Sequence, residues 1–285
     1  MVFRTRERGR LLIDYPSVNQ LNKTVVYFQR DTSNYYVLDA SDPYNSFDQI
    51  PFNLMGLNTL FLDPANKTFK VFSLKKGNAT EALLINGDID IEGKLEGNFQ
   101  IESTNYSRAK YLRKYNTLGE KTYIDQLQSD YNGLRITSLK LENPDNDSLA
   151  LIQNFEFKFN LTEPDGDYIY FNPNQFTGFQ NNPFLSETRV SNIDFGGRYN
   201  YSIIGYYKMP SGYKINVLPK SANLQMPDKS IVFKRVIGEQ GSSLVVRYTI
   251  DYNRSLFSKD EYLLIHEFFK KMHEMLNEQI VLKKT

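Results

Sequence analysis

The stretch EALLINGDIDIEGKLEGNFQIES, residues 81–103, decides the fold class of this chain. Its apolar residues fall mostly at odd positions, with Asp, Glu and Lys between them: Leu83, Ile85, Ile89, Ile91, Leu95, Phe99 and Ile101. A period of two residues is typical of a β-strand with one buried and one solvent-facing side. The stretch therefore predicts a pair of antiparallel strands, with Asn86-Gly87 as a tight turn inside it.

Strand patterns continue on both sides of this stretch. Before it, two hairpins are predicted, one from residues 24–28 and 35–39 and one from residues 57–62 and 68–74. Residues 24–28 and 35–39 are continuous apolar runs, which favours buried strands. After the stretch, strands are expected at residues 134–141, 149–161, 199–207, 230–237 and 243–251.

Helical spacing interrupts the strands in two places. Residues 106–115 and 117–133 predict two short helices, the second ending at Gly133. Near the C-terminus, Ser258 and Glu261 form a capping box ahead of an amphipathic helix that runs to Asn277, and an extended tail follows.

The predicted fold is mainly β, of the α+β class, with antiparallel sheets and a few helices. Three parts are expected. Residues 1–56 would be residual strands of a larger core, and residues 57–163 a β region with two short helices. Residues 164–285 would form a β-sandwich-like C-terminal domain ending in the amphipathic helix.

The composition excludes several classes of function. Apolar residues make up 40% and charged residues 24% of the chain, which is a globular balance. The formal net charge is +1, so no nucleic-acid partner is expected. There is no cysteine, which excludes a thiol nucleophile and thiolate metal sites within this sequence. No apolar run is long enough for a transmembrane helix, and the first residues do not form a signal peptide.

No metal or cofactor site is predicted. His266 and His273 are seven residues apart on the last helix, too far along its axis to share a metal ion. Asp88, Asp90 and Glu92 alternate with isoleucines, which favours the solvent face of a strand. The basic cluster at residues 108–114, with its interleaved tyrosines, is interpreted as a solvated helix face.

One segment suggests a ligand surface. The loop FNPNQFTGFQNNPF, residues 171–184, carries four rings that could stack on a carbohydrate or a peptide: Phe171, Phe176, Phe179 and Phe184. The competing interpretation is that these rings are tucked under the loop as a local cluster.

The residues FRTRERGRLLIDYPSVNQLNKTVVYFQRDTSNYYVLDASDPY, 3–44, resemble the last portion of a transglutaminase-like core from large bacterial cell-envelope proteins. In that family a Cys nucleophile on a helix is followed by a strand ending in Thr-Arg, like Thr5-Arg6 here. A Phe-Asn-His strand supplies the base, and a Leu-Asp-Ala-Thr strand supplies the orienting acid. The resemblance continues weakly through most of the chain and strengthens again over residues 205–285.

The resemblance places Lys23 at the base position and Asp39 at the acid position, and the segment that would carry the Cys lies before Met1. An ordinary lysine, with a pKa of about 10.4, is already protonated at neutral pH and cannot accept the thiol proton. The chain is therefore expected to be non-catalytic, a scaffold or interaction module from the C-terminal half of a longer protein or from a reading frame begun at an internal Met.

The resemblance also implies partners and a location. The expected partner is protein, either upstream domains of the same protein or another envelope protein, and the expected location is the periplasm or cell envelope. Residues 1–56 would either pack on the neighbouring domain or mediate self-association, because their strands lack a covering layer.

Two alternatives of other classes stay open. One is a partial transglutaminase-like cysteine enzyme that needs a separate Cys-bearing segment, with Asp39 still orienting the base. The other is a carbohydrate- or peptide-binding β module.

Overall fold

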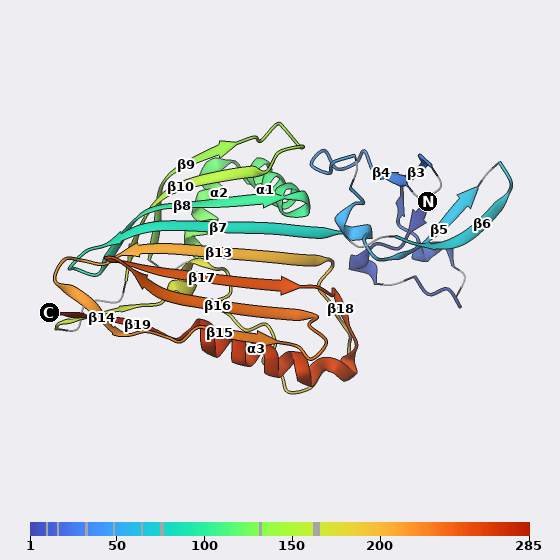
Figure 1. Ribbon diagram of the computed structural model, residues 1–285. Coiled ribbons are helices and arrows are strands. Elements are labelled where there is room, and N and C mark those ends of the chain that lie inside the picture. The colour runs from blue at the N-terminus through green and yellow to red at the C-terminus, as the bar shows by residue number, and fades with distance from the viewer. Residues whose placement is uncertain are drawn as a thin grey trace.

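The computed structural model describes residues 1–285 except 10, 16, 32–33, 48, 64, 75–76, 131–132 and 162–165. The chain forms two parts that lie side by side (Figure 1). We call residues 1–74 the N-terminal lobe and residues 77–285 the sheet lobe. Within the described part of the chain, no helix combines the length and the apolar character needed to cross a membrane.

The N-terminal lobe is built from short strands. A sheet in the order β2-β1-β5-β6 stands beside the β3–β4 hairpin, and the two share a core that includes Phe3, Val25 and Val37. The strands are β1 (Val2–Phe3), β2 (Lys23–Thr24), β3 (Val26–Gln29), β4 (Tyr35–Leu38), β5 (Asn58–Asp63) and β6 (Thr68–Ser73).

Both hairpins predicted in this lobe are confirmed by antiparallel pairing of β3 with β4 and of β5 with β6. The predicted burial of the first hairpin is wrong for β3, because Val26 and Phe28 are exposed. Only the other face of this hairpin, which includes Tyr27 and Val37, packs on the lobe's core.

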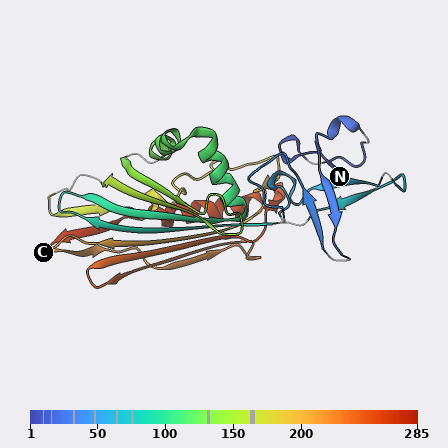
Figure 2. The same cartoon turned by 90° about the horizontal axis from the view of Figure 1, so that it is seen from above.

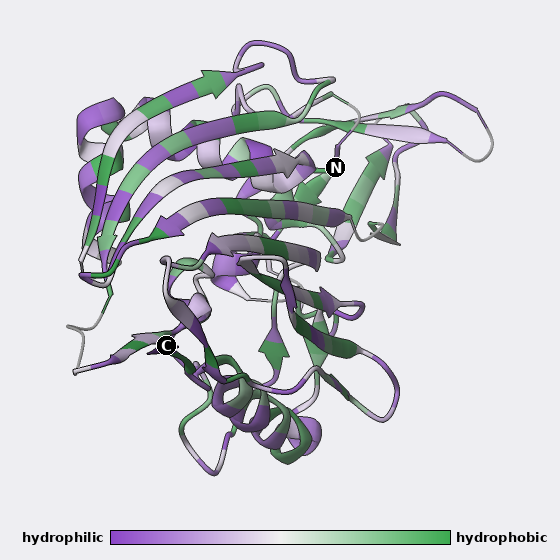
Figure 3. Cartoon of the chain, turned by 60° about the vertical axis from the view of Figure 1, so that its left-hand side comes forward, coloured by the Kyte–Doolittle hydropathy of each residue, from purple (hydrophilic) through white to green (hydrophobic). Residues whose placement is uncertain are grey.

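The sheet lobe is dominated by one large sheet. In the described residues it has eight strands in the order β15-β16-β17-β13-β7-β8-β10-β9, and it curves strongly (Figure 3). The strands are β7 (Asn78–Ile89), β8 (Lys94–Thr104), β9 (Leu134–Glu142), β10 (Leu151–Asn160), β13 (Arg198–Lys208), β15 (Ala222–Gln225), β16 (Ile231–Gln240) and β17 (Ser243–Tyr252).

The centre of this sheet is a parallel pair, β7 with β13, whereas its other neighbours are antiparallel. The sheet therefore joins strands from the two ranges that the sequence separates, 57–163 and 164–285, while β5 and β6 pair inside the N-terminal lobe. The domain boundaries themselves stay predictions, and the one near residue 163 lies outside the described residues.

The expected tight turn at Asn86-Gly87 is wrong. Both residues continue β7, where they pair with Asn98 and Gly97 of β8. The chain turns at residues 90–93 instead, because the Asp90 carboxylate accepts the backbone N–H groups of Glu92 (2.9 Å) and Lys94 (2.8 Å). Asp90 and Glu92 therefore shape a turn rather than line the face of a strand.

Helices and two small sheets share one core with the large sheet. Helix α1 (Asn105–Leu118) packs on β7 and β8, α2 (Glu120–Asp130) packs on β9, and α3 (Tyr262–Leu276) lies beside β15 (Figures 1 and 2). Tyr123 of α2, Phe269 of α3 and Phe155 of β10 belong to the same buried cluster. The small sheets contain β11 (Tyr168–Phe171), β14 (Tyr213–Val217), β19 (Ile280–Lys284), β12 (Ile193–Asp194) and β18 (Leu256–Phe257).

These elements confirm the predicted mainly β fold with a C-terminal helix. The capping box of Ser258 and Glu261 is present ahead of α3, and the extended tail forms β19. Short 3-10 helices complete the described structure: η1 (Arg6–Arg8), η2 (Val18–Gln20), η3 (Phe52–Leu54), η4 (Pro173–Phe176) and η5 (Lys259–Glu261).

Candidate functional site

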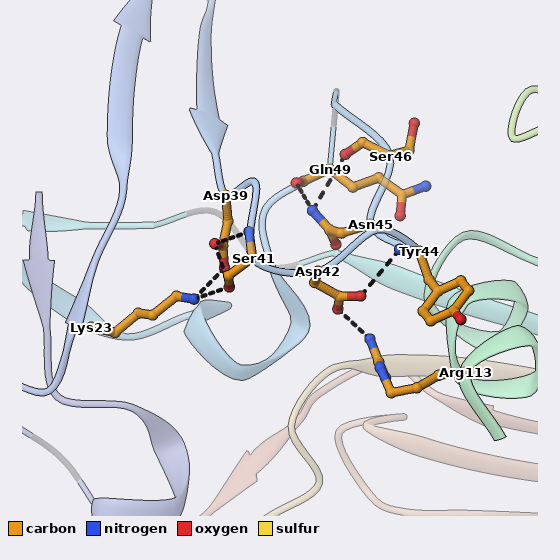
Figure 4. Close-up of polar contacts among 9 residues, drawn as sticks. All are labelled: Lys23, Asp39, Ser41, Asp42, Tyr44, Asn45, Ser46, Gln49 and Arg113. Atoms are coloured by element: carbon orange, nitrogen blue, oxygen red, sulfur yellow. Dashed lines mark hydrogen bonds and ion pairs between the residues drawn. The ribbon is translucent and has the colours of Figure 1, made fainter. Parts of the chain in front are cut away.

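Lys23 and Asp39, the two residues at the family's base and acid positions, lie together in the N-terminal lobe. Lys23 belongs to β2 and Asp39 directly follows β4. Lys23 Nζ is 2.8 Å from Asp39 Oδ2 and donates to Ser41 Oγ at 2.5 Å (Figure 4). Ser41 donates to Asp39 Oδ1 from its backbone N–H (3.1 Å) and its hydroxyl (2.8 Å). The two residues singled out by the resemblance therefore form an ion pair.

The environment keeps Asp39 ionised. Its side chain is only 7% exposed, and burial on its own raises the pKa of the carboxyl group. The hydrogen bonds from Lys23 and Ser41 outweigh burial, so the pKa of Asp39 lies below its usual value. Asp39 thus acts as an acceptor for an ammonium group and a serine.

The ion pair borders a cleft between the two lobes, with a volume of about 610 Å³. The N-terminal lobe contributes the Lys23–Asp39 pair, Asp42 and Phe52 to its lining. The sheet lobe contributes residues of β7, α1 and β13: Ala79, Tyr106, Ser107, Lys110, Arg113, Tyr199 and Tyr201. This volume is in the range of about 300–1,000 Å³ that is usual for small-molecule sites.

Polar contacts hold the lobes together around the cleft. Arg113 of α1 forms an ion pair with Asp42 (Figure 4), and Tyr106 donates its hydroxyl hydrogen to the Ile50 carbonyl at 2.8 Å. On another side, Arg6 Nη1 lies 3.0 Å from Asp194 Oδ1 of β12. Direct polar contacts therefore join the two lobes around the cleft.

Aromatic rings form one wall of the cleft. The rings of Tyr199 and Tyr201, neighbours on one face of β13, are nearly parallel, with 5.9 Å between their centroids. Phe52 of η3 packs edge-on to Tyr199 at 6.4 Å. Burial raises the pKa of Tyr199 to about 12 and also raises the pKa of Tyr201, so both hydroxyls are neutral at physiological pH.

The prediction that the rings of residues 171–184 form an exposed ligand surface is wrong. Phe171, Phe176 and Phe184 are buried in the main core and Phe179 is half-buried. Phe171 packs on Tyr207, and Phe184 packs on Phe269 of α3. The segment fills the space beneath the large sheet, so Phe171, Phe176 and Phe184 stabilise the core rather than form an exposed ligand surface. The spacing of the four phenylalanines within the loop does not indicate whether their rings face solvent or the core.

The basic cluster on α1 is in part the solvated helix face that was expected, since Lys110 and Arg113 are exposed. Arg108 is buried and donates to the carbonyl groups of Asn143 (3.0 Å) and Pro144 (2.8 Å). Lys110 and Arg113 face the cleft. The helical period is the only sequence signal that separates buried Arg108 from the cleft-facing pair, because residues 110 and 113 are three apart and share a side of the helix.

The histidines are not brought together with other metal ligands. His273 contacts the Gln180 carbonyl and Asn277, and His266 lies beside Glu267. Among the residues that the structure describes, no three His, Asp or Glu side chains are grouped so as to hold a metal ion.

The sequence missed the cleft residues Tyr199, Tyr201 and Asp42. None of the three lies in a recognisable sequence motif. They meet only because β13 pairs with β7 and because the 39–53 segment folds against α1. No local pattern could have identified them as one site.

A family described as a domain of unknown function with a solved structure (DUF3858) matches residues 167–282, which is less than half of the chain. No curated protein matches. A crystal structure of a presumed protease from Parabacteroides distasonis aligns with 99% of this chain at 12% identity and a TM-score of 0.47. The chain spans 39% of the length of that protein.

Proposed function

We propose that this chain is a non-catalytic interaction module. The observation that carries the proposal is the ion pair between Lys23 and Asp39, at the positions where the resembled transglutaminase-like cores have a base and its orienting acid. A general base must offer a lone pair to the proton that it removes. An ammonium group that donates to a carboxylate and to Ser41 has none to offer.

The same contacts support a structural role for the pair. Lys23 belongs to the four-stranded sheet of the N-terminal lobe, and Asp39 follows the separate β3–β4 hairpin. Their charged ends tie the two sheets together. Both side chains are mostly buried, so loss of either one would leave the other as an uncompensated charge inside the lobe.

The face of the β3–β4 hairpin supports the interaction role. Val26 is 63% exposed, Phe28 54% and Phe47 68%. Phe28 lies directly opposite Tyr36 in the hairpin, with 6.3 Å between the ring centroids, and Tyr36 contacts Phe47 at 5.8 Å. Within the described residues, β3 and β4 form a two-stranded sheet that no further strand joins. An apolar face on such a hairpin is a typical protein-binding surface.

The proposed partner of this face is protein, either a second copy of this chain or a neighbouring envelope domain. Charged substitution tests this without disturbing the core: Phe28→Asp should weaken self-association or partner binding. Phe69→Asp is a matched control, because Phe69 is 73% exposed on the other hairpin of the same lobe. Light scattering after size-exclusion chromatography measures the effect. Equal behaviour of both variants and the wild-type chain would contradict the role of the hairpin.

The absence of catalysis is tested on the chain itself. Peptide hydrolysis and amine transfer should stay at the buffer rate for the wild-type chain and for Lys23→Ala and Asp39→Ala. A rate above buffer that both substitutions abolish would overturn the proposal, since it would assign these residues to a reaction. A rate that neither substitution changes would point to a contaminating enzyme, and repurification checks this.

A further inference from the structure

We propose that the cleft between the lobes binds an uncharged oligosaccharide. This site is separate from the exposed hairpin face and does not depend on the proposed non-catalytic role. It uses residues that neither the resemblance nor the family match assigns: Tyr199, Tyr201, Phe52 and Lys110.

The aromatic wall suits the faces of sugar rings. Tyr199 and Tyr201 present two nearly parallel rings 5.9 Å apart, and Phe52 adds a third ring from the opposite lobe. The C–H groups on one face of a pyranose carry partial positive charge, and the face of an aromatic ring carries partial negative charge. These rings therefore give the cleft an aromatic lining, here called the platform, that can contact an apolar sugar face.

The polar groups of the cleft suit hydroxyl groups. Tyr199 and Tyr201 line the cleft, and a tyrosine hydroxyl can both donate and accept a hydrogen bond. Asn53 in the lining offers an amide, which is again both a donor and an acceptor. Sugar hydroxyls need partners of this kind, because each of them also donates and accepts.

The charges of the cleft favour a neutral ligand. Lys23 is paired with Asp39, and Arg113 is paired with Asp42, so four of the charged side chains compensate each other. The remaining charged groups in the lining, Lys110 and Glu7, have opposite signs. A strongly anionic or cationic ligand would find no excess of opposite charge.

The shape of the cleft favours more than one sugar unit. A second cavity of about 300 Å³ shares Lys110 and Tyr201 with the first and continues beneath α1. Glu81 lies there and accepts a hydrogen bond from the Tyr111 hydroxyl at 2.8 Å. Two adjoining cavities with shared walls fit an extended ligand better than a single ring.

A peptide fits this cleft less well. An extended peptide is usually held through its backbone at a free strand edge. β7 and β13, which contribute to the cleft, lie inside the large sheet and have hydrogen-bonded neighbours on both sides. In this cleft only side chains could hydrogen-bond to the N–H and C=O groups of a peptide backbone. The same side chains can hydrogen-bond to sugar hydroxyls directly.

The test is calorimetric titration of the full chain with cellohexaose, maltohexaose, chitohexaose and mannohexaose, and with hexaalanine as the peptide probe. We expect at least one oligosaccharide to bind at millimolar concentration or below. Tyr199→Ala should weaken that binding by about tenfold or more, because it removes one ring of the platform. Tyr201→Phe keeps the ring but removes the hydroxyl, and Lys110→Ala removes an ammonium group at an exposed position. Each variant should weaken oligosaccharide binding, because it removes a polar group.

Tyr206→Ala is the matched control. Tyr206 is on the same strand as Tyr199 and Tyr201, but its side chain points to the opposite face and is 38% exposed. Its substitution should leave binding unchanged, and thermal unfolding verifies that every variant is folded. Failure of all four oligosaccharides to bind, binding of hexaalanine alone, or oligosaccharide binding that the cleft variants leave unchanged would each overturn the proposal.

Discussion

Lys23 and Asp39 connect two sheets of the N-terminal lobe through charged ends 2.8 Å apart. Lys23→Met should therefore lower the free energy of unfolding by about 2 kcal/mol, because it leaves a mostly buried carboxylate without its cation. Urea unfolding at neutral pH, followed by circular dichroism, measures the change.

An exposed ion pair provides the control for this prediction. Lys158 Nζ lies 2.9 Å from Glu96 Oε1, but both side chains are about half exposed. Lys158→Met should change the free energy of unfolding by less than about 0.5 kcal/mol, since water already screens that pair. Equal losses in the two variants would show that burial does not strengthen the Lys23–Asp39 pair.

The pKa of Asp39 predicts how this stabilisation depends on pH. The folded-state pKa lies below the ordinary value, so the ion pair contributes fully at pH values above the unfolded pKa of about 3.9. Its contribution is lost as the pH falls through the folded-state pKa. The difference in unfolding free energy between the wild-type chain and Asp39→Asn should therefore be constant near neutral pH and shrink below about pH 4. Unfolding titrations over this range test the sign, and a difference that grows toward acid pH would contradict it.

The pairing of Gly87 with Gly97 predicts a site of low tolerance in the large sheet. A Cβ atom on Gly97 would lie 2.0 Å from the Asn86 carbonyl oxygen and 2.7 Å from Gly87 Cα. Because both contacts are to backbone, β7 and β8 would have to separate or shift register. Gly97→Ala should lower the free energy of unfolding by about 3 kcal/mol or more, measured by urea unfolding.

Gly238 is a matched control on β16, because a Cβ atom there would have no neighbour within 4 Å. Gly238→Ala should stay within about 0.5 kcal/mol of the wild-type chain. If both alanine variants were equally stable, the close approach of β7 and β8 at Gly97 would be wrong.

The elements that the sequence predicted correctly rest on local signals. The alternation within residues 81–103 identifies β7 and β8, and the Ser258–Glu261 capping box identifies the start of α3. These patterns depend on residues a few positions apart, so a single sequence contains them in full.

The parts that the sequence missed depend on distant contacts. Tyr199 lies beside Ala79 only because β13 pairs in parallel with β7, and the cleft exists only because the N-terminal lobe packs on α1. Asn86-Gly87 has the composition of a turn, yet the glycine pair with Gly97 keeps it inside a strand. Likewise, the phenylalanines of residues 171–184 are buried by α3 and the large sheet, which are remote in sequence. Lys23 and Asp39 are sixteen positions apart, and they were singled out because the family resemblance, rather than any local pattern, assigns them to the base and acid positions.

Arg235 of β16 fixes the C-terminal end of α3 to the large sheet. Its buried guanidinium group donates to the Lys220 carbonyl at 2.7 and 3.0 Å, to the Met275 carbonyl, and to Glu278 Oε2 at 2.8 Å. Met275 is in the last turn of α3, so one side chain satisfies a carbonyl at the helix end and one at residue 220. Arg235→Met should lower the free energy of unfolding by about 3 kcal/mol, because both carbonyls lose their donor and Glu278 loses its cation.

The geometry of the guanidinium group also predicts the result of a conservative change. Arg235→Lys keeps the charge but cannot reach three acceptors with a planar fork, so it should lose much of the same stability. Lys234→Met, at the exposed neighbouring position, is the control and should have little effect. Hydrogen exchange locates the damage: protection should fall first in the last turn of α3 and in β19, which follows it. Full protection of these amides in Arg235→Met would show that the apolar stripe of α3, including Phe268 and Met272, holds the helix end without the arginine.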